Sequence, residues 1–151
     1  MTPHKRLAEL GIVLPELLPP KGAYAGYRVV AGQLWVSGHT ARTASTRALA
    51  GVVGFDVDID TAKHQARLAA VNLLAAIEHG IGLDQVEAII HLRGYVRSAD
   101  DFTGHPSVID GASELLAEVF GPTTGSHART AVGVSSLPGG ACVELELVVA
   151  T

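Results

Sequence analysis

A helical pattern of about twenty residues in the middle of the chain constrains the fold more than any other feature. Asp58 or Asp60 is suited to cap the first turn of a helix, and Gly80 is suited to end it. Between them, apolar residues recur every three or four positions and so share one stripe of a helix surface. These residues are Ala62, Ala66, Ala69, Leu73 and Ile77. The pattern predicts an amphipathic helix to about His79 that packs this stripe against another layer.

Strands and a second long helix are expected around this helix. Runs rich in Val, Leu and Trp at 27–31 and 33–37 predict a hairpin, and alternation over 86–96 predicts a strand. Helical spacing from Pro106 or Ser107 to Phe120 predicts the second helix. With two C-terminal strands, the order is β-β-α-β-α-β-β. We predict an α+β fold with a single mixed sheet and two helices packed on one face.

The N-terminal residues 1–21 are expected to form an arm within a single domain that spans 1–151. A short helix is predicted at Pro3–Gly11, and the prolines that follow exclude regular structure up to about Lys21. The segment 42–54 has no clear period, which predicts a loop with a short strand near 51–54.

Two chemically distinctive residues lie in the C-terminal segment. Arg129 stands at the start of an apolar strand, and Glu144 lies in a second strand beyond the turn at 137–140. Antiparallel pairing of 130–135 with 142–149 is the arrangement predicted by the turn signal. Glu144 and Glu146 then share the strand face opposite the apolar residues. We therefore expect a guanidinium and a carboxylate to line one groove.

These residues carry a resemblance to a known family. The block Ala128-Arg129-Thr130, followed by Leu137-Pro138 and Val143-Glu144-Leu145-Glu146, resembles the C-terminal signature of the RidA (YjgF/YER057c/UK114) family, formerly called the L-PSP endoribonucleases. Tyr24 and the strand-ending step Val36-Ser37-Gly38 resemble its N-terminal landmarks. The likeness covers roughly 22–149 and implies a chorismate-mutase-like fold and a barrel-like homotrimer with its sites between subunits.

The resemblance also assigns roles to site residues. It implies that Arg129 holds a substrate carboxylate and that Glu144 positions a water, with Ser37 in support. From the residues alone, Arg129 could instead form a structural ion pair with Glu144 or Glu146, and Glu144 could be a solvated strand residue. Ser37 could likewise be a turn-capping serine.

Four further residues are candidates for substrate binding. Tyr24 could close over a ligand or could simply pack, and the amide of Gly38 could bind a ligand next to Ser37. His39 and His127 adjoin Ser37 and Arg129 in the sequence, although lone histidines are more often surface or core residues. The remaining histidines show no metal-ligand spacing, so no metal is expected, and no cofactor is needed.

Some positions depart from the family pattern, which makes this chain a divergent, longer member. Ala131 stands where characterised deaminases of the family usually carry a cysteine, and His127 and Ala23 replace a proline in the two motifs. These differences leave the arginine and glutamate in place and put the substrate in question.

Composition argues against several classes of partner. Net charge is −4 with only three lysines, and no basic stripe is visible, so a nucleic-acid partner is not expected. No apolar stretch is long enough to span a bilayer, no secretion signal is seen, and Cys142 is the only cysteine, which together predict a cytoplasmic protein. The apolar fraction of 48% is high for a monomer and favours an oligomer.

Two functions follow from these observations as hypotheses. The first is an enzyme that hydrolyses reactive enamines and imines, such as 2-aminoacrylate and 2-imino acids, to 2-keto acids and ammonia. The second is a non-catalytic trimer that binds small carboxylates or protein partners. A ribonuclease is a weaker third hypothesis, because the chain lacks a basic surface for phosphates.

Overall fold

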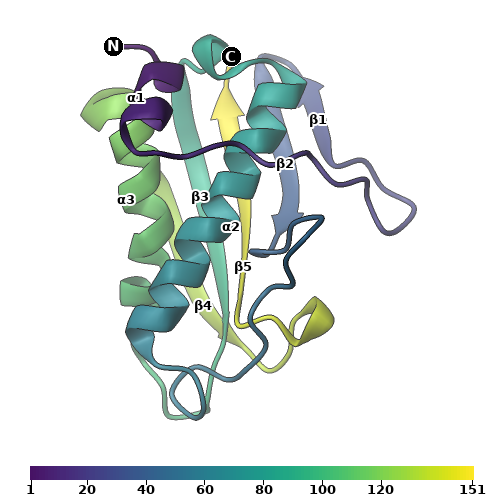
Figure 1. The fold of residues 1–151 in the computed structure, drawn as a ribbon, viewed down its shortest axis with the longest axis vertical. Coiled ribbons are helices and arrows are strands. Elements are labelled where there is room, and N and C mark those ends of the chain that lie inside the picture. Colours follow the sequence, from purple (N-terminus) through teal and green to yellow (C-terminus); the bar gives the residue numbers. More distant parts are fainter.

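Five strands form one mixed sheet with the order β1-β2-β5-β3-β4 in the computed structural model, which describes residues 1–151 (Figure 1). The helices and strands in chain order are α1 (Pro3–Glu9), β1 (Tyr27–Val30), β2 (Gln33–His39), α2 (Ile59–Gly80), β3 (Ala88–Arg97), α3 (His105–Thr124), β4 (Ala128–Val134) and β5 (Val143–Ala150). The predicted α+β class and strand and helix order are confirmed, and the short helix predicted at Pro3–Gly11 is confirmed as α1.

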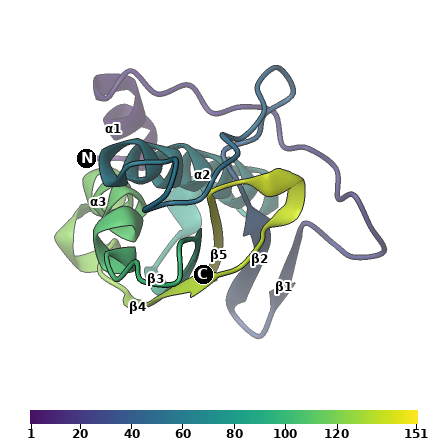
Figure 2. The same ribbon diagram turned by 90° about the horizontal axis from the view of Figure 1, so that it is seen from below.

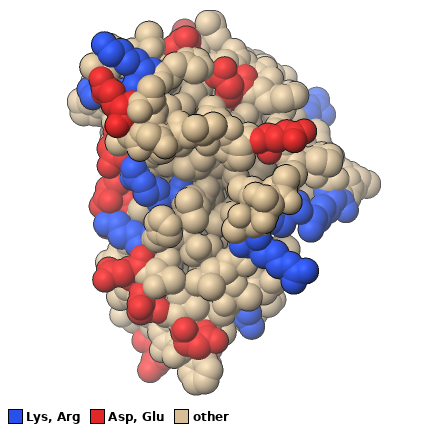
Figure 3. Space-filling model, viewed as in Figure 1, with Lys and Arg blue, Asp and Glu red and all other residues tan.

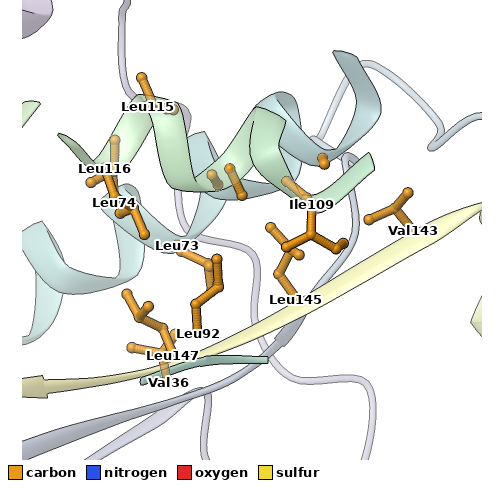
Figure 4. Close-up of a cluster of buried hydrophobic side chains, with 14 of the residues drawn as sticks. Val36, Leu73, Leu74, Leu92, Ile109, Leu115, Leu116, Val143, Leu145 and Leu147 are labelled. Carbon is orange, nitrogen blue, oxygen red and sulfur yellow. The ribbon is translucent and has the colours of Figure 1, made fainter. Parts of the chain in front are cut away.

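The two long helices cover one face of this sheet, as predicted (Figure 2). Alternation along the central strand β5 turns Val143, Leu145 and Leu147 toward the helices, where they are buried. Leucines and isoleucines of α2 and α3 fill the space above them (Figure 4). Each fully buried side chain of this size contributes roughly 1.5–3 kcal/mol of transfer free energy, so this interface holds the two layers together.

The predicted pairing of 130–135 with 142–149 is wrong. β4 pairs in parallel with β3, and β5 pairs antiparallel with β3 and β2, so β3 separates β4 from β5. The reason is the helical crossover: α3 returns the chain to the end where β3 began, and the next strand must then run parallel to β3. β5 runs the other way and takes the position between β2 and β3. The turn at 137–140 therefore bridges across the end of β3.

The hairpin of β1 and β2 ends at a distortion that shapes the pocket described below. Ala31 and Gly32 both have positive φ (51° and 71°), which suits the two-residue turn of a twisted hairpin. β2 does not end at Ser37-Gly38 as expected but continues to His39. Its pairing with β5 is interrupted between Val36 and His39. This bulge separates the ends of β2 and β5.

The helix boundaries agree with the capping signals in the sequence. The Asp58 carboxylate accepts a hydrogen bond from the Thr61 amide at 2.7 Å and caps α2. The chain departs from helical geometry at Gly121 (φ 81°), just before Pro122, although the last turn of α3 continues beyond it. Segment 42–54 is irregular as predicted, but isolated bridges at Ala50 and Val53 replace the expected short strand.

The sheet face away from the helices, called the open face here, is uncovered. It carries partly exposed apolar side chains, including Trp35 and Val132, beside the polar pairs of β3 and β5. None of the helices combines the length and apolar character needed to cross a membrane.

Candidate functional site

The main pocket lies where β2 separates from β5. It has a volume of about 690 Å³. It is enclosed by the end of the N-terminal arm and the residues that follow it (16–24), the end of β2, the loop at 40–50 and one face of α2. The arm and the loop both lie on the side of the molecule that carries β1 and β2 (Figure 1). Glu144 enters this pocket from β5.

Glu144 is half-buried and has no hydrogen-bond or ion-pair partner in the chain. Burial, and secondarily the charge of Glu146, raises the pKa of the Glu144 carboxyl above its ordinary value. The carboxylate lies across Gly38, where a Cβ atom would come within 2.7 Å of Glu144 Oε1. The absence of a side chain at 38 therefore makes room for this carboxylate, which remains free to exchange a proton.

Glu146, two residues further along β5, has a different environment. Its carboxylate accepts hydrogen bonds from the Arg93 guanidinium and, at 3.2 Å, from the Tyr95 hydroxyl. The three side chains lie on the open face of neighbouring strands, where Arg93 pairs with Glu146 across the ladder. Glu146 is thus neutralised by a cation, whereas Glu144 is not. This contrast distinguishes the two acids more firmly than strand periodicity does.

Ser37, Gly38 and Tyr24 border the same pocket. The Ser37 hydroxyl donates to the Ala25 carbonyl at 2.7 Å, so its oxygen keeps only lone pairs for a ligand or water. The Ser37 amide also donates to the Gly26 carbonyl, and the two bonds tie the arm to β2. Tyr24 extends from the arm and is more than half exposed (56%), which leaves its ring able to contact a ligand.

His39 and Arg42 form the wall beyond Gly38. Burial, and secondarily the positive charge of Arg42, lowers the pKa of the His39 imidazole, so His39 is neutral near pH 7. Arg42 is half-buried and lines the same pocket. Asn72 of α2 donates hydrogen bonds at 2.8 Å to the carbonyls of Thr40 and Arg42 and fixes this part of the loop. A neutral imidazole and a cation therefore face the cavity from a restrained segment.

Arg129 and His127 lie outside this pocket. Arg129 pairs with Leu92 of β3, whose side chain is buried beneath the helices, so its guanidinium reaches α3 on the helix-covered face. There it donates to the Asp110 carboxylate at 2.7 Å and to the Ser113 hydroxyl at 3.1 Å. The expectation that Arg129 and Glu144 line one groove is not met within one chain, because β3 separates their strands and they alternate to opposite faces. The ion-pair partner is Asp110 rather than Glu144 or Glu146.

His127 belongs to the same α3 network. Its Nε2 lies 2.9 Å from the Ser113 hydroxyl, and its Nδ1 lies 2.7 Å from the Gly125 carbonyl oxygen. These contacts hold the start of β4 against the end of α3.

The pocket thus gathers five of the seven predicted site residues, namely Tyr24, Ser37, Gly38, His39 and Glu144. Sequence reasoning missed Arg42 and Asn72. A signal for Asn72 is present, because it is the one polar residue that the long apolar stripe of α2 buries. Arg42 carries no comparable signal, since it lies in an irregular loop.

Charge is distributed unevenly over the surface. Acidic and basic side chains alternate along the side formed by α2 and α3, where Lys63 pairs with Glu114 and Arg67 with Glu118. Basic side chains gather on the opposite side, around the arm and the loop after β2 (Figure 3). No group of three or more His, Cys, Asp or Glu side chains is placed to hold a metal ion.

Comparison with known proteins identifies relatives along the whole chain. The family model described as "YjgF/chorismate_mutase-like, putative endoribonuclease" matches residues 4–148. The chain is 35% identical to "Protein TCP17" of Trypanosoma cruzi over 144 residues, which are 95% of this chain and 90% of that protein. The crystal structure of Atu1372 from Agrobacterium tumefaciens, described as of unknown function, is 38% identical with a TM-score of 0.89 over 99% of this chain and 91% of that one.

A crystal structure from Shewanella oneidensis MR-1, described as a "putative endoribonuclease", matches 100% of both chains with a TM-score of 0.95 and 30% identity. Likeness to RidA-type structures is limited to the fold: E. coli TdcF, solved with bound serine, is 20% identical with a TM-score of 0.63 over 91% of this chain and 94% of that one. The chain therefore resembles the first group more closely in structure than the RidA-type proteins, as expected of a divergent member.

Proposed function

The chain belongs to the YjgF/chorismate mutase-like family, and we propose that it hydrolyses imines of small 2-oxo acids, and the enamines that tautomerise to them, in the Glu144 pocket. The observation that carries this proposal is Glu144 itself. A carboxylate that is half-buried, unpaired and raised in pKa by burial, beside a cavity, is suited to proton transfer.

The reaction needs one group that can accept and return a proton. The Glu144 carboxylate would take a proton from a water molecule as the water oxygen forms a bond to the carbon of the C=N group. The protonated carboxyl would then give that proton to the nitrogen, whose bond to the carbon becomes single. The carboxylate would next take the proton of the new hydroxyl group and pass it to the nitrogen as the C–N bond breaks and the C=O bond forms, so that ammonia and a 2-oxo acid leave. One water is consumed and no electrons are transferred, so the step requires no redox partner.

The other pocket residues are assigned supporting roles. Ser37 would accept a hydrogen bond from the attacking water through its free lone pairs, because its proton is already donated to Ala25. The amide at Gly38 and the neutral imidazole of His39 would contact the substrate, and Tyr24 would cover it from the arm. His127 has no such role in a single chain, because it is bound to Ser113 and Gly125.

We also propose a homotrimer. The supporting observation is the open face, where Val30 (54% exposed), Trp35 (48%) and Val132 (41%) present apolar surface that subunit contact would cover. Sites between subunits would allow Arg129 of one subunit to approach the Glu144 pocket of the next, as the resemblance implies. Asp110 would then have to release the guanidinium. Light scattering that gives the mass of a monomer at micromolar concentration would refute the trimer.

A non-catalytic binder of small carboxylates or protein partners is the second candidate. It is favoured by the crystal structure of E. coli TdcF, which holds serine without a reaction being implied. In that case the pocket would bind a 2-oxo acid or an amino acid, and Glu144 would take no part in turnover.

An ammonia-release assay tests the proposed function. Imino acids are generated in situ from amino acids by an amino acid oxidase, and ammonia release is compared with a parallel reaction without the protein, because imines also hydrolyse spontaneously. Acceleration above this control supports the enzyme. No acceleration with several aliphatic imino acids, together with retained binding of 2-oxo acids, would favour the binder.

A further inference from the structure

The Glu144 pocket is larger than the smallest substrates of the proposed reaction need. Its volume of about 690 Å³ lies within the range of roughly 300–1,000 Å³ in which proteins bind drug-sized ligands. An imino acid as small as 2-iminopropanoate, with its C=N carbon beside Glu144, would leave much of this space empty. The loop at 40–50 and the residues 16–24 bound the remaining space. These walls therefore determine which side chain the substrate can carry.

Arg42 is the least exposed cation in these walls. Its side chain makes no hydrogen bond or ion pair within the chain, so the guanidinium keeps all of its donors for a ligand. Burial, and secondarily the charge of Arg42, lowers the pKa of the His39 imidazole, which places the guanidinium near that ring. Asn72 holds the backbone by donating to the carbonyls of Thr40 and Arg42. Arg42 is thus a restrained, uncompensated charge on the pocket wall.

The pocket carries an excess of positive charge even when Glu144 is ionised, the form in which it accepts a proton from water. Lys21, Arg42 and Arg47 line the pocket, and none of the three has an ion-pair partner. Glu16 and Glu144 are the only acidic residues in the lining, so three cations face two carboxylates and one positive charge remains. The chain as a whole carries a net charge of −4, which makes this local excess unusual.

A substrate with a single carboxylate would leave this excess unmatched. In the proposed trimer, Arg129 of the next subunit would bind the 2-carboxylate, and that contact adds one positive and one negative charge to the site. The excess within the pocket would remain. A second negative group on the substrate would match it, and a carboxylate suits a guanidinium because the two planar groups can form two parallel hydrogen bonds.

The order of residues along the wall gives the direction in which such a substrate would lie. The Glu144 carboxylate lies across Gly38, so the reacting carbon belongs at this end of the wall. His39 follows, and Arg42 comes after it at the start of the loop. The side chain of a substrate whose C=N group is beside Glu144 can therefore extend past the neutral imidazole toward the guanidinium.

We propose that Arg42, with Arg47 and Lys21 nearer the rim, binds a second carboxylate at the far end of the substrate, so that imines of 2-oxo dicarboxylic acids are the preferred substrates. The inference rests on the proposed function for the reacting group, and it adds the substrate class. Arg42 is then a specificity-determining residue. The 2-carboxylate stays with Arg129, and proton transfer stays with Glu144.

Calorimetry with 2-oxoglutarate and 2-oxopentanoate tests this inference, because the two acids have equally long carbon chains and only the first has a second carboxylate. The parent is expected to bind 2-oxoglutarate about tenfold to a hundredfold more tightly, the range for one charged hydrogen-bonded contact. Arg42→Gln should remove most of this preference, and Arg47→Gln should reduce it severalfold. Arg28→Gln is the matched control, because Arg28 is an exposed, unpaired arginine of β1 outside the pocket, and it should keep the preference.

A parent that binds the two acids equally, or binds neither, would overturn the inference. Equal weakening of both acids in Arg42→Gln would also overturn it, because that result would place Arg42 at the 2-carboxylate or in a purely structural role. A preference lost equally in Arg28→Gln and Arg42→Gln would reduce the effect to the general field of the basic surface and would likewise refute a contact.

Ammonia release separates this inference from the proposed function. A preference for 2-oxoglutarate that depends on Arg42, without accelerated ammonia release from any imino acid, would remove only the enzyme. Accelerated release from monocarboxylic imino acids, without a preference for a second carboxylate, would remove only the role of Arg42.

Discussion

Replacing Glu144 by glutamine tests the proton-transfer role most directly. Glutamine keeps the size of the side chain and some hydrogen bonding but cannot exchange a proton. We expect Glu144→Gln to lower imine hydrolysis by roughly a hundredfold to ten-thousandfold, the usual contribution of a positioned acid or base. Glu146→Gln is the matched control, because it lies two residues away on the same strand face but is already paired with Arg93. That change should alter the rate only severalfold.

Glu144→Gln is expected to lower activity but to keep or increase the stability of the folded protein at pH 7. Burial raises the pKa of Glu144 in the folded protein, so folding favours its protonated form. This stabilisation is fully present below the pKa of an unfolded glutamate, about 4.3, and is lost as the pH rises through the folded value. At pH 7 the buried charge therefore opposes folding, and glutamine removes it. Glu144→Gln should unfold at a temperature equal to or above that of the parent at pH 7, and this advantage should disappear at pH 4 and below.

Ammonia release above the spontaneous rate, and thermal unfolding at pH 7 and pH 4, measure the two effects on the same preparations. The combination of lost activity and retained or increased stability is what a functional carboxylate predicts and a structural one does not. Activity of Glu144→Gln equal to that of the parent, with both above the control without protein, would refute the assignment. Lower stability at pH 7 would show that Glu144 has a stabilising partner, contrary to its unpaired environment.

Three other substitutions test the architecture of the site. Gly38→Ala should lower activity about tenfold to a hundredfold with little change in stability. The added Cβ would lie 2.7 Å from Glu144 Oε1, which is too close, so the carboxylate would have to move; kinetics equal to those of the parent would contradict this. Asn72→Ala should reduce the free energy of unfolding by about 1–3 kcal/mol, measured in urea, and weaken 2-oxoglutarate binding, because two loop carbonyls near Arg42 lose their donor. Arg129→Lys should cost about 1–2 kcal/mol of stability, because a lysine cannot keep both the Asp110 and the Ser113 contact; an unchanged unfolding temperature would contradict this.

Much of the fold was predictable because its signals are local. Asp58 caps α2 and the apolar stripe of that helix packs as its period requires. Strand pairing could not be predicted in the same way, because the neighbours of a strand depend on the tertiary path of the chain and not on local sequence. The turn at 137–140 has the composition of a hairpin turn, yet the crossover through α3 had already placed β4 parallel to β3. β5 pairs with the other edge of β3. The turn at 137–140 therefore connects two strands that do not pair with each other.

The site divides in the same way. Ser37, Gly38 and His39 are consecutive, and Glu144 meets them because β5 pairs with β2, so landmarks that identify the family also come together in space. Arg42 was not found, because an arginine in a loop is available to a ligand only if no acidic side chain lies close to it in space. Its position in the sequence does not give those spatial neighbours.

The position of β3 decides which cation can serve the Glu144 pocket. β3 lies between the strands of Arg129 and Glu144, and the alternation of side chains sends the two residues to opposite faces. Because β3 is paired with a strand on each edge, no change of side-chain rotamer within one chain brings Arg129 and Glu144 into contact. Arg129 can therefore reach a Glu144 pocket only from a second subunit, and only after Asp110 releases its guanidinium.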